Sequence, residues 1–243
     1  MKPLPIRLSA VLIAMFAATS ARAAASEPWP EVPLPPKAHV EWVGDSLRLN
    51  GVPMRVMRFA SRASRAEIVE YYRAFWSGGY PARPSVTPLG PATVVGQAHG
   101  PYYMTVKVRD AANQASEGVI TVSRVLGSKV DRSAGDLPLV PGAKVVSVIE
   151  ANDPGRRSRE IVVSSPAPRQ SVVQYYQGSL QTAGWSQIQA NDTPPSARGR
   201  AGSFLVFQRG RDELQLSIVD GARGQGSLMV ANRVTKDTGP VAF

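Results

Sequence analysis

The feature that most constrains the fold of this chain is an internal repeat at a spacing of 104 residues. Residues 54–76, MRVMRFASRASRAEIVEYYRAFW, align without gaps on residues 158–180, SREIVVSSPAPRQSVVQYYQGSL, and seven of the 23 positions are identical. The identities include the tyrosine pairs Tyr71-Tyr72 and Tyr175-Tyr176. Such a recurrence indicates one structural unit present twice, so we predict two tandem units of roughly a hundred residues each.

Each repeat contains the same order of predicted elements, and the first repeat shows it best. Asn50-Gly51 is a strong hairpin signal between two strands. Ser64 and Glu67 then form a capping-box pattern that opens a helix, in which apolar residues recur at helical spacing up to Trp76. One face of this helix is therefore expected to lie on a core.

Strands with a period of two resume after each helix, and the alternation indicates which residues face the core. Met57 and Phe59 in the first repeat, and Ile161 and Val163 in the second, are expected to point inward. A single helix among several strands cannot supply the crossovers that a parallel sheet needs. The predicted fold class is α+β, with two tandem ββαβββ domains, each an antiparallel sheet of about five strands packed on one helix.

The two ends of the chain and the repeats together give its predicted organisation. The parts are a signal peptide at 1–23, a proline-rich extended lead-in at 24–36, a first domain at 37–126, a linker at 127–136, a second domain at 137–235 and a tail at 236–243. A positive start, a short apolar run and an Ala-x-Ala pattern ending at Ala23 indicate the signal peptide. The run is too short to span a bilayer, so we predict a periplasmic or secreted protein with no transmembrane segment after cleavage.

Composition narrows the chemistry that this sequence can perform. It contains no cysteine and only two histidines, so we expect no disulfide, no metal site and no cofactor. The formal charge falls from +10 to +7 when Lys2, Arg7 and Arg22 leave with the signal peptide, because no carboxylate leaves with them. A basic exported protein favours an anionic surface or an envelope protein as its partner, and we expect no nucleic acid.

The tetrapeptide Gly44-Asp45-Ser46-Leu47 resembles the first block of the GDSL serine hydrolases. That chemistry requires a histidine base held by an aspartate. Neither His39 nor His99 lies in the Asp-x-x-His pattern of that family. Asp45 and Ser46 are also typical turn residues, so we interpret Ser46 as part of a turn between two short strands and predict that the protein is not an enzyme. A GDSL-like hydrolase that uses Ser46 is the disfavoured alternative.

The arginines are the candidate binding residues. Six of them lie in equivalent regions of the two repeats: Arg55, Arg58, Arg62, Arg65, Arg159 and Arg169. Arg55 aligns with Arg159, and Arg65 aligns with Arg169, so the two repeats could present one anion-facing surface. The alternative interpretation is a solvated face of an arginine-rich protein that binds nothing.

Two resemblances bear on the function of the chain. PGAK at 141–144, followed by Y-Y-x-x-x-L-x-x-x-G-W at 175–185, resembles uncharacterised bacterial envelope proteins that carry PGAK and then F-Y-x-x-x-L-x-x-x-G-W. Two small one-helix sheet domains in tandem are also similar in plan to BamC, the accessory lipoprotein of outer-membrane assembly. These resemblances imply a class of envelope protein and not an activity. Predicted export, duplicated small domains, unpaired sheet edges and the lack of a catalytic set lead us to expect a non-enzymatic binding or accessory protein that docks on a secretion, pilus or outer-membrane assembly complex. Binding of anionic glycolipid or glycan through the arginines is the alternative.

Overall fold

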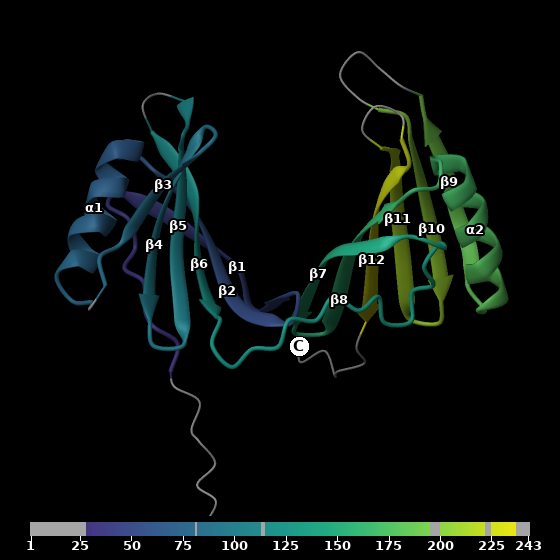
Figure 1. Cartoon of the computed structure of the whole chain (residues 1–243), viewed down its shortest axis with the longest axis horizontal. Coiled ribbons are helices and arrows are strands. Elements are labelled where there is room, and N and C mark those ends of the chain that lie inside the picture. The colour runs from purple at the N-terminus through teal and green to yellow at the C-terminus, as the bar shows by residue number, and fades with distance from the viewer. Residues whose placement is uncertain (1–27, 81, 113–114, 195–199, 222–224, 237–243) are drawn as a thin grey trace, which may run out of the picture.

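The computed structural model describes residues 28–80, 82–112, 115–194, 200–221 and 225–236. The predicted signal peptide at 1–23, the start of the predicted lead-in and nearly all of the predicted tail lie outside these residues. Strands dominate the described chain, and each half of it contains one helix (Figure 1). The N-terminal half consists of β1 (Ala38–Leu49), β2 (Val52–Ser61), α1 (Arg65–Ser77), β3 (Ser85–Leu89), β4 (Ala92–His99), β5 (Tyr102–Asp110) and β6 (Ser116–Arg124).

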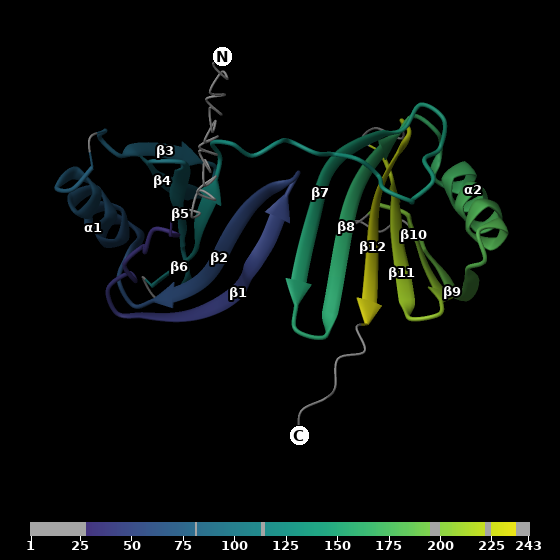
Figure 2. The same ribbon diagram turned by 90° about the horizontal axis from the view of Figure 1, so that it is seen from below.

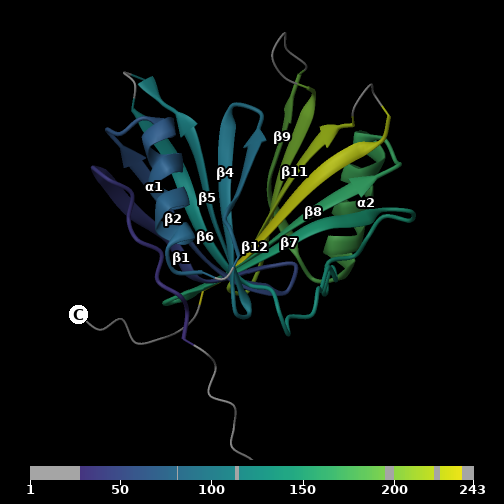
Figure 3. The ribbon, with the colours of Figure 1, turned by 60° about the vertical axis from the view of Figure 1, so that its left-hand side comes forward.

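The C-terminal half has the same order of elements. It consists of β7 (Lys144–Asp153), β8 (Arg156–Ser165), α2 (Arg169–Thr182), β9 (Ser186–Thr193), β10 (Gly202–Arg209), β11 (Asp212–Asp220) and β12 (Ser227–Lys236). Figure 1 shows α1 and α2 at opposite outer sides of the molecule, with the strands of both halves between them. In Figure 3 the strands of the two halves fan apart from the end of the molecule where β1 and β7 meet.

The expected fold class, α+β with two tandem ββαβββ domains, is wrong. All twelve described strands belong to one antiparallel sheet, in the order β3-β4-β5-β6-β2-β1-β7-β8-β12-β11-β10-β9. Each half contributes six strands and not about five, because β3 in the N-terminal half and β9 in the C-terminal half form an additional outer strand. Both strands are exposed along their whole length, so they lack the alternation by which a half-buried strand is recognised in a sequence.

Helix α1 begins where the sequence predicts. The Ser64 side chain accepts a hydrogen bond from the Glu67 backbone N–H, and the Glu67 carboxylate accepts one from the Ser64 N–H at 2.8 Å, so the predicted capping box is confirmed. These hydrogen bonds hold the pKa of Glu67 below its ordinary value. Helix α2 begins after Pro168, which supplies no side-chain cap.

Each half has its own hydrophobic cluster between its helix and one face of the sheet. In the N-terminal half, Ile68, Tyr72 and Trp76 of α1 are fully buried against Phe59 and residues of β4 to β6. In the C-terminal half, Val172, Tyr176 and Leu180 of α2 occupy the same positions on their helix. We call the sheet face that packs on α1 and α2 the helix face, and the opposite face the helix-free face.

The segment before each half packs on the helix of that half. Tyr72 donates a hydrogen bond from its hydroxyl to the Pro33 carbonyl at 2.6 Å, and Tyr175 donates one to the Leu139 carbonyl at 2.9 Å. Burial raises the pKa of Tyr72 and of Tyr176, and the neighbouring tyrosine of each pair raises it further. Tyr72 and Tyr176 are therefore structural residues of the two hydrophobic clusters.

Candidate functional site

The two halves of the sheet are joined by a short strand pairing, which we call the seam. Three residue pairs connect β1 to β7: Leu47–Ala151, Arg48–Glu150 and Leu49–Ile149. Every other neighbouring strand pair in the sheet has at least five such pairs, and β3 and β4 have five. Figure 2 shows β1 and β7 meeting near the tip of β1 and diverging away from that point.

The hairpin between β1 and β2 extends the seam. Asn50 and Gly51 have φ angles of 50° and 80°, which are the angles of a tight hairpin turn, so the predicted Asn-Gly hairpin is confirmed. The Asn50 N–H donates to the Val148 carbonyl at 2.7 Å, and the Asn50 side-chain oxygen accepts from the Val148 N–H at 2.8 Å. A Cβ atom at Gly51 would lie 2.6 Å from the Lys129 carbonyl oxygen, so only glycine lets the linker pass this closely.

Most of β1 has no strand partner on the side that faces β7. In the described part of the chain, residues 38–46 pair with β2 alone. From Ala38 to Trp42 the register with β2 is regular, and the bulges begin only between Trp42 and Gly44. Trp42 is 58% exposed and Val43 is 49% exposed. This stretch is therefore an unpaired strand edge with a large apolar side chain at its end.

Ser46 does not lie in a turn, so that interpretation is wrong. It belongs to β1, in the irregular stretch between Gly44 and Leu47 where the register with β2 shifts. Ser46 lines a groove on the seam whose lining contains no histidine among the described residues, and His39 lines a different hollow. The geometry of a serine nucleophile beside a histidine base is not formed by these residues.

Arg65 and Arg169 occupy equivalent places at the starts of the helices, and both tie a helix to the sheet. Arg65 lies 3.4 Å from a carboxylate oxygen of Asp110 on β5. Arg169 lies 3.1 Å from Asp192 on β9 and 3.4 Å from Asp220 on β11, and its side chain is only 14% exposed. These contacts give Arg65 and Arg169 a structural role in holding each helix against the sheet, and this role requires no ligand.

The other four candidate arginines separate into two pairs. Arg55 stacks its guanidinium 4.9 Å from the ring centroid of Trp29 on the helix face. Its counterpart Arg159 pairs with Glu150 at 2.8 Å and donates to the Ser133 carbonyl at 2.8 Å. Arg58 and Arg62 are exposed, and Arg58 lies on the helix-free face. The structure therefore does not bring the six arginines together on one surface.

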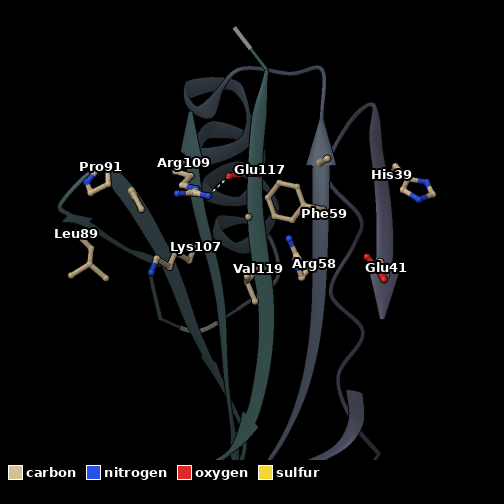
Figure 4. Close-up of a pocket in the computed structure, with 13 residues that line it drawn as sticks. His39, Glu41, Arg58, Phe59, Leu89, Pro91, Lys107, Arg109, Glu117 and Val119 are labelled. Atoms are coloured by element: carbon tan, nitrogen blue, oxygen red, sulfur yellow. Dashed lines mark ion pairs between the residues drawn. The ribbon is translucent and has the colours of Figure 1, made fainter. Parts of the chain in front are cut away.

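A shallow hollow of about 390 Å³ lies on the helix-free face of the N-terminal half (Figure 4). Figure 4 shows Arg58 of β2 and Lys107 and Arg109 of β5 projecting from this face, with an ion pair between Arg109 and Glu117. His39 and Glu41 of β1 form the side of the hollow nearest the unpaired edge of β1. The hollow mixes cations with carboxylates and therefore favours polar side chains as neighbours.

Two further hollows lie on the helix face at the seam, and together we call them the seam groove. Their volumes are about 780 and 530 Å³, and both are lined by Arg48, Pro53 and Glu150. Within it, burial alone would raise the pKa of Asp212, but hydrogen bonds from Thr235 and Arg233 outweigh burial and lower that pKa. Hydrogen bonds from Ser133 lower the pKa of Asp131.

Sequence reasoning missed Trp42, Arg48 and Lys129 as site residues. The exposure of Trp42 could not be read from the sequence, because it depends on β1 and β7 pairing over so short a stretch. Arg48 and Lys129 lie 81 positions apart in the chain and come together only because the linker crosses the β1–β2 hairpin. The one available signal was the Asn50-Gly51 turn, which indicates where that hairpin ends.

Among the described residues, no group of three or more histidines or carboxylates is placed to hold a metal ion. Within the same part of the chain, neither helix is long and apolar enough to cross a membrane.

Comparison with known proteins gives one family match and several structural likenesses. A family model described as START domain-like matches residues 145–227, which belong to the C-terminal half. The match covers about a third of the chain, so the chain is similar to that family over this stretch only. No curated protein matches the chain.

Among solved structures, the chain is similar to the T6SS immunity protein TplEi from Pseudomonas aeruginosa in its apo form, with 13% identity, coverage of 86% of both chains and a TM-score of 0.30. It is also similar to a chain of the Tle4–Tli4 complex, with 12% identity, coverage of 85% of this chain and 83% of that one, and a TM-score of 0.30. TM-scores of this size do not establish a shared fold.

Proposed function

We propose that this protein is an exported, non-enzymatic binding protein of the bacterial cell envelope that takes up an extended strand of a protein partner along the edge of β1. The observation that carries the proposal is the unpaired edge at Ala38–Trp42 with its exposed tryptophan. An edge of this kind offers backbone donors and acceptors to an added strand, and side chains on both faces give specificity. The predicted signal peptide supports a periplasmic or secreted location.

The edge of β1 is better suited to strand addition than the two outer edges of the sheet. β3 contains Pro88, which lacks a backbone N–H. β9 pairs irregularly with β10 at Val206–Phe207, and its Asp192 is engaged by Arg169. Proline, bulges and charges are the means by which proteins protect strand edges from pairing. The Ala38–Trp42 stretch has neither a proline nor a bulge.

The two faces of the β1 edge would select different partner side chains. On the helix face, Val40 and Ala38 pack at the margin of the N-terminal core, so apolar partner residues are favoured there. On the helix-free face, His39 and Glu41 line the hollow of Figure 4, so polar or basic partner residues are favoured there. We expect a partner strand that alternates apolar and polar residues.

The test uses a matched pair of charge substitutions. The mature protein, its Trp42→Glu variant and its Phe75→Glu variant are used as baits in envelope extract, and captured proteins are quantified by mass spectrometry. Phe75 is a good control because it is an exposed aromatic residue on α1, 43% exposed and away from the β1 edge. We expect the wild type and Phe75→Glu to capture the same discrete protein, and Trp42→Glu to lose it at least tenfold. Equal capture by all three proteins would rule out the β1 edge.

The non-enzymatic part of the proposal has its own test. The purified mature protein and its Ser46→Ala variant are assayed on short- and long-chain nitrophenyl esters. We expect both to be indistinguishable from the uncatalysed reaction, because no described histidine lines the groove that contains Ser46. An esterase activity that disappears in Ser46→Ala would overturn the proposal that the protein is not an enzyme.

A further inference from the structure

The seam groove combines the two halves into one concave surface. Its larger hollow takes residues from the lead-in, from β1 and β2, and from β7, β8, β11 and β12. Its smaller hollow adds the end of β6 and the linker. Arg48 lines both hollows and stands opposite Glu150 in the seam pairing, so it marks the centre of the groove.

The charge of the groove is positive and unevenly compensated. Six cationic residues line it: Arg48, Arg124, Lys129, Arg157, Arg159 and Arg233. Three acidic residues line it: Asp131, Glu150 and Asp212. Arg159 pairs with Glu150 at 2.8 Å and Arg233 pairs with Asp212 at 2.7 Å, so two of the three cations that line the groove on β8 and β12 are paired with carboxylates of its lining.

The positive excess lies at the end formed by the hairpin, β6 and the linker. Among the ion pairs between described residues, none involves Arg48, Arg124 or Lys129. The Arg48 guanidinium donates to the Gly51 carbonyl at 3.2 Å, which leaves most of its donors for a ligand. Asp131 accepts a hydrogen bond from the Ser133 N–H at 2.8 Å, and the nearby Lys129 charge contributes to its lowered pKa, so Asp131 offsets one of the three positive charges at this end.

We propose that the seam groove binds an extended acidic segment of a protein partner, with its carboxylates at Arg48, Arg124 and Lys129. Guanidinium groups bind carboxylates through paired, charge-assisted hydrogen bonds. Ser46, Asn152, Ser158 and Thr235 line the rest of the groove and supply uncharged hydrogen-bonding groups for a peptide backbone. A flat membrane surface fits this place less well, because the cations lie in a concavity with walls from both halves.

The experiment measures the binding of a fluorescently labelled hexaglutamate peptide by anisotropy at low and moderate salt. The variants are Arg48→Gln/Lys129→Gln in the groove and Arg58→Gln/Arg62→Gln outside it, which remove the same charge. We expect the groove variant to weaken binding at least tenfold and the control variant less than threefold. Binding should also weaken as salt rises, because part of the attraction is screened. An Arg124→Gln/Lys129→Gln variant replaces the first if Arg48→Gln loosens the seam and lowers the melting temperature.

Several results would overturn the proposal. Equal weakening by the groove and control variants would show that only total charge matters. If hexaglutamate does not bind, the groove is not a site for acidic peptides. If the groove variants abolish binding of phosphatidylglycerol vesicles and hexaglutamate does not compete with the vesicles, the cations bind a lipid surface instead. The proposal stands independently of strand addition at β1: Trp42→Glu should leave hexaglutamate binding unchanged, so failure at either site can be told apart from failure at the other.

Discussion

The N-terminal and C-terminal halves have the same order of elements and each stacks arginine on a tryptophan, but in the C-terminal half ion pairs accompany this contact. In the C-terminal half, Trp185 has the guanidinium groups of Arg209 and Arg233 at 4.5 and 5.7 Å from its ring centroid. Arg233 also pairs with Asp136 at 2.5 Å and with Asp212 at 2.7 Å. In the N-terminal half, the corresponding contact is a tryptophan from the lead-in, Trp29, stacked on Arg55.

The difference shows that one arrangement of strands can be stabilised with more ion pairs or with fewer. Among the described residues, four ion pairs lie within the C-terminal half, two more join that half to Asp136 of the linker, and three lie in the N-terminal half. Both halves bury aromatic residues: Tyr72, Trp76 and Tyr102 in the N-terminal half, and Tyr176, Trp185 and Phe207 in the C-terminal half. The half with fewer ion pairs is also the half that carries the unpaired edge of β1. The comparison therefore predicts that core truncation, acid and loss of a helix cap act on the two halves to different extents.

The largest expected effect is loss of the aromatic core. Trp76 is fully buried, and Trp76→Ala should lower the free energy of unfolding of the N-terminal half by about 3–5 kcal/mol. Leu180 occupies the equivalent position in α2, and Leu180→Ala should lower that of the C-terminal half by about 2–5 kcal/mol. Because only three residue pairs form the seam, each change should act on its own half. Hydrogen exchange along a urea series measures this, and exchange that rises equally in both halves would show one cooperative unit instead.

The successes and failures of sequence reasoning follow the same division between local and long-range contacts. The capping box at Ser64 and the Asn50-Gly51 hairpin depend on neighbouring residues, and the structure confirms both. Phe59 and Ile161 point to the core as predicted, because alternation along one strand is also local. The joining of twelve strands into one sheet depends on β1 meeting β7, about a hundred residues away, which no local pattern encodes. The sequence around Ser46 predicts a turn where the structure has a bulge, because turns and bulges contain the same residue types.

Acid should destabilise the C-terminal half through Asp212. The pKa of Asp212 lies below its ordinary value of 3.8, so the stability that its ionised form contributes is present above about pH 4 and is lost as pH falls through the lowered pKa. Asp212→Asn removes charge-assisted bonds to Arg233 and Thr235 and should cost about 1.5–2 kcal/mol at neutral pH. The variant should also show a flatter loss of stability as the pH falls below about 4. Urea unfolding across this range checks both points, and an acid limb identical to that of the wild type would contradict the role of Asp212.

The two helix-anchoring arginines provide a smaller contrast. Arg169→Ala should destabilise the C-terminal half by about 1 kcal/mol, because Arg169 is mostly buried and contacts Asp192, Asp220 and Ser203. Arg65→Ala should cost less than about 0.5 kcal/mol, because its one ion pair, to Asp110, is solvent-exposed. Chemical denaturation of both variants in low and high salt measures the difference. An equal cost at both positions would show that burial of Arg169 adds nothing.

The helix caps give another small effect, which can be tested by removing the cap of α1 and by installing one on α2. Ser64→Ala removes the hydroxyl that caps α1 and should cost about 0.5–1 kcal/mol, a fall of a few degrees in melting temperature. Helix α2 has no side-chain cap, and its N-cap and N3 positions are Pro168 and Ser171. Pro168→Ser with Ser171→Glu would install the same Ser-x-x-Glu box, and we expect a gain of about 0.5 kcal/mol or less, because the lost proline also frees the unfolded chain. If Ser64→Ala is neutral while the double variant stabilises α2, the cap of α1 is redundant with the packing of its aromatic residues on the core.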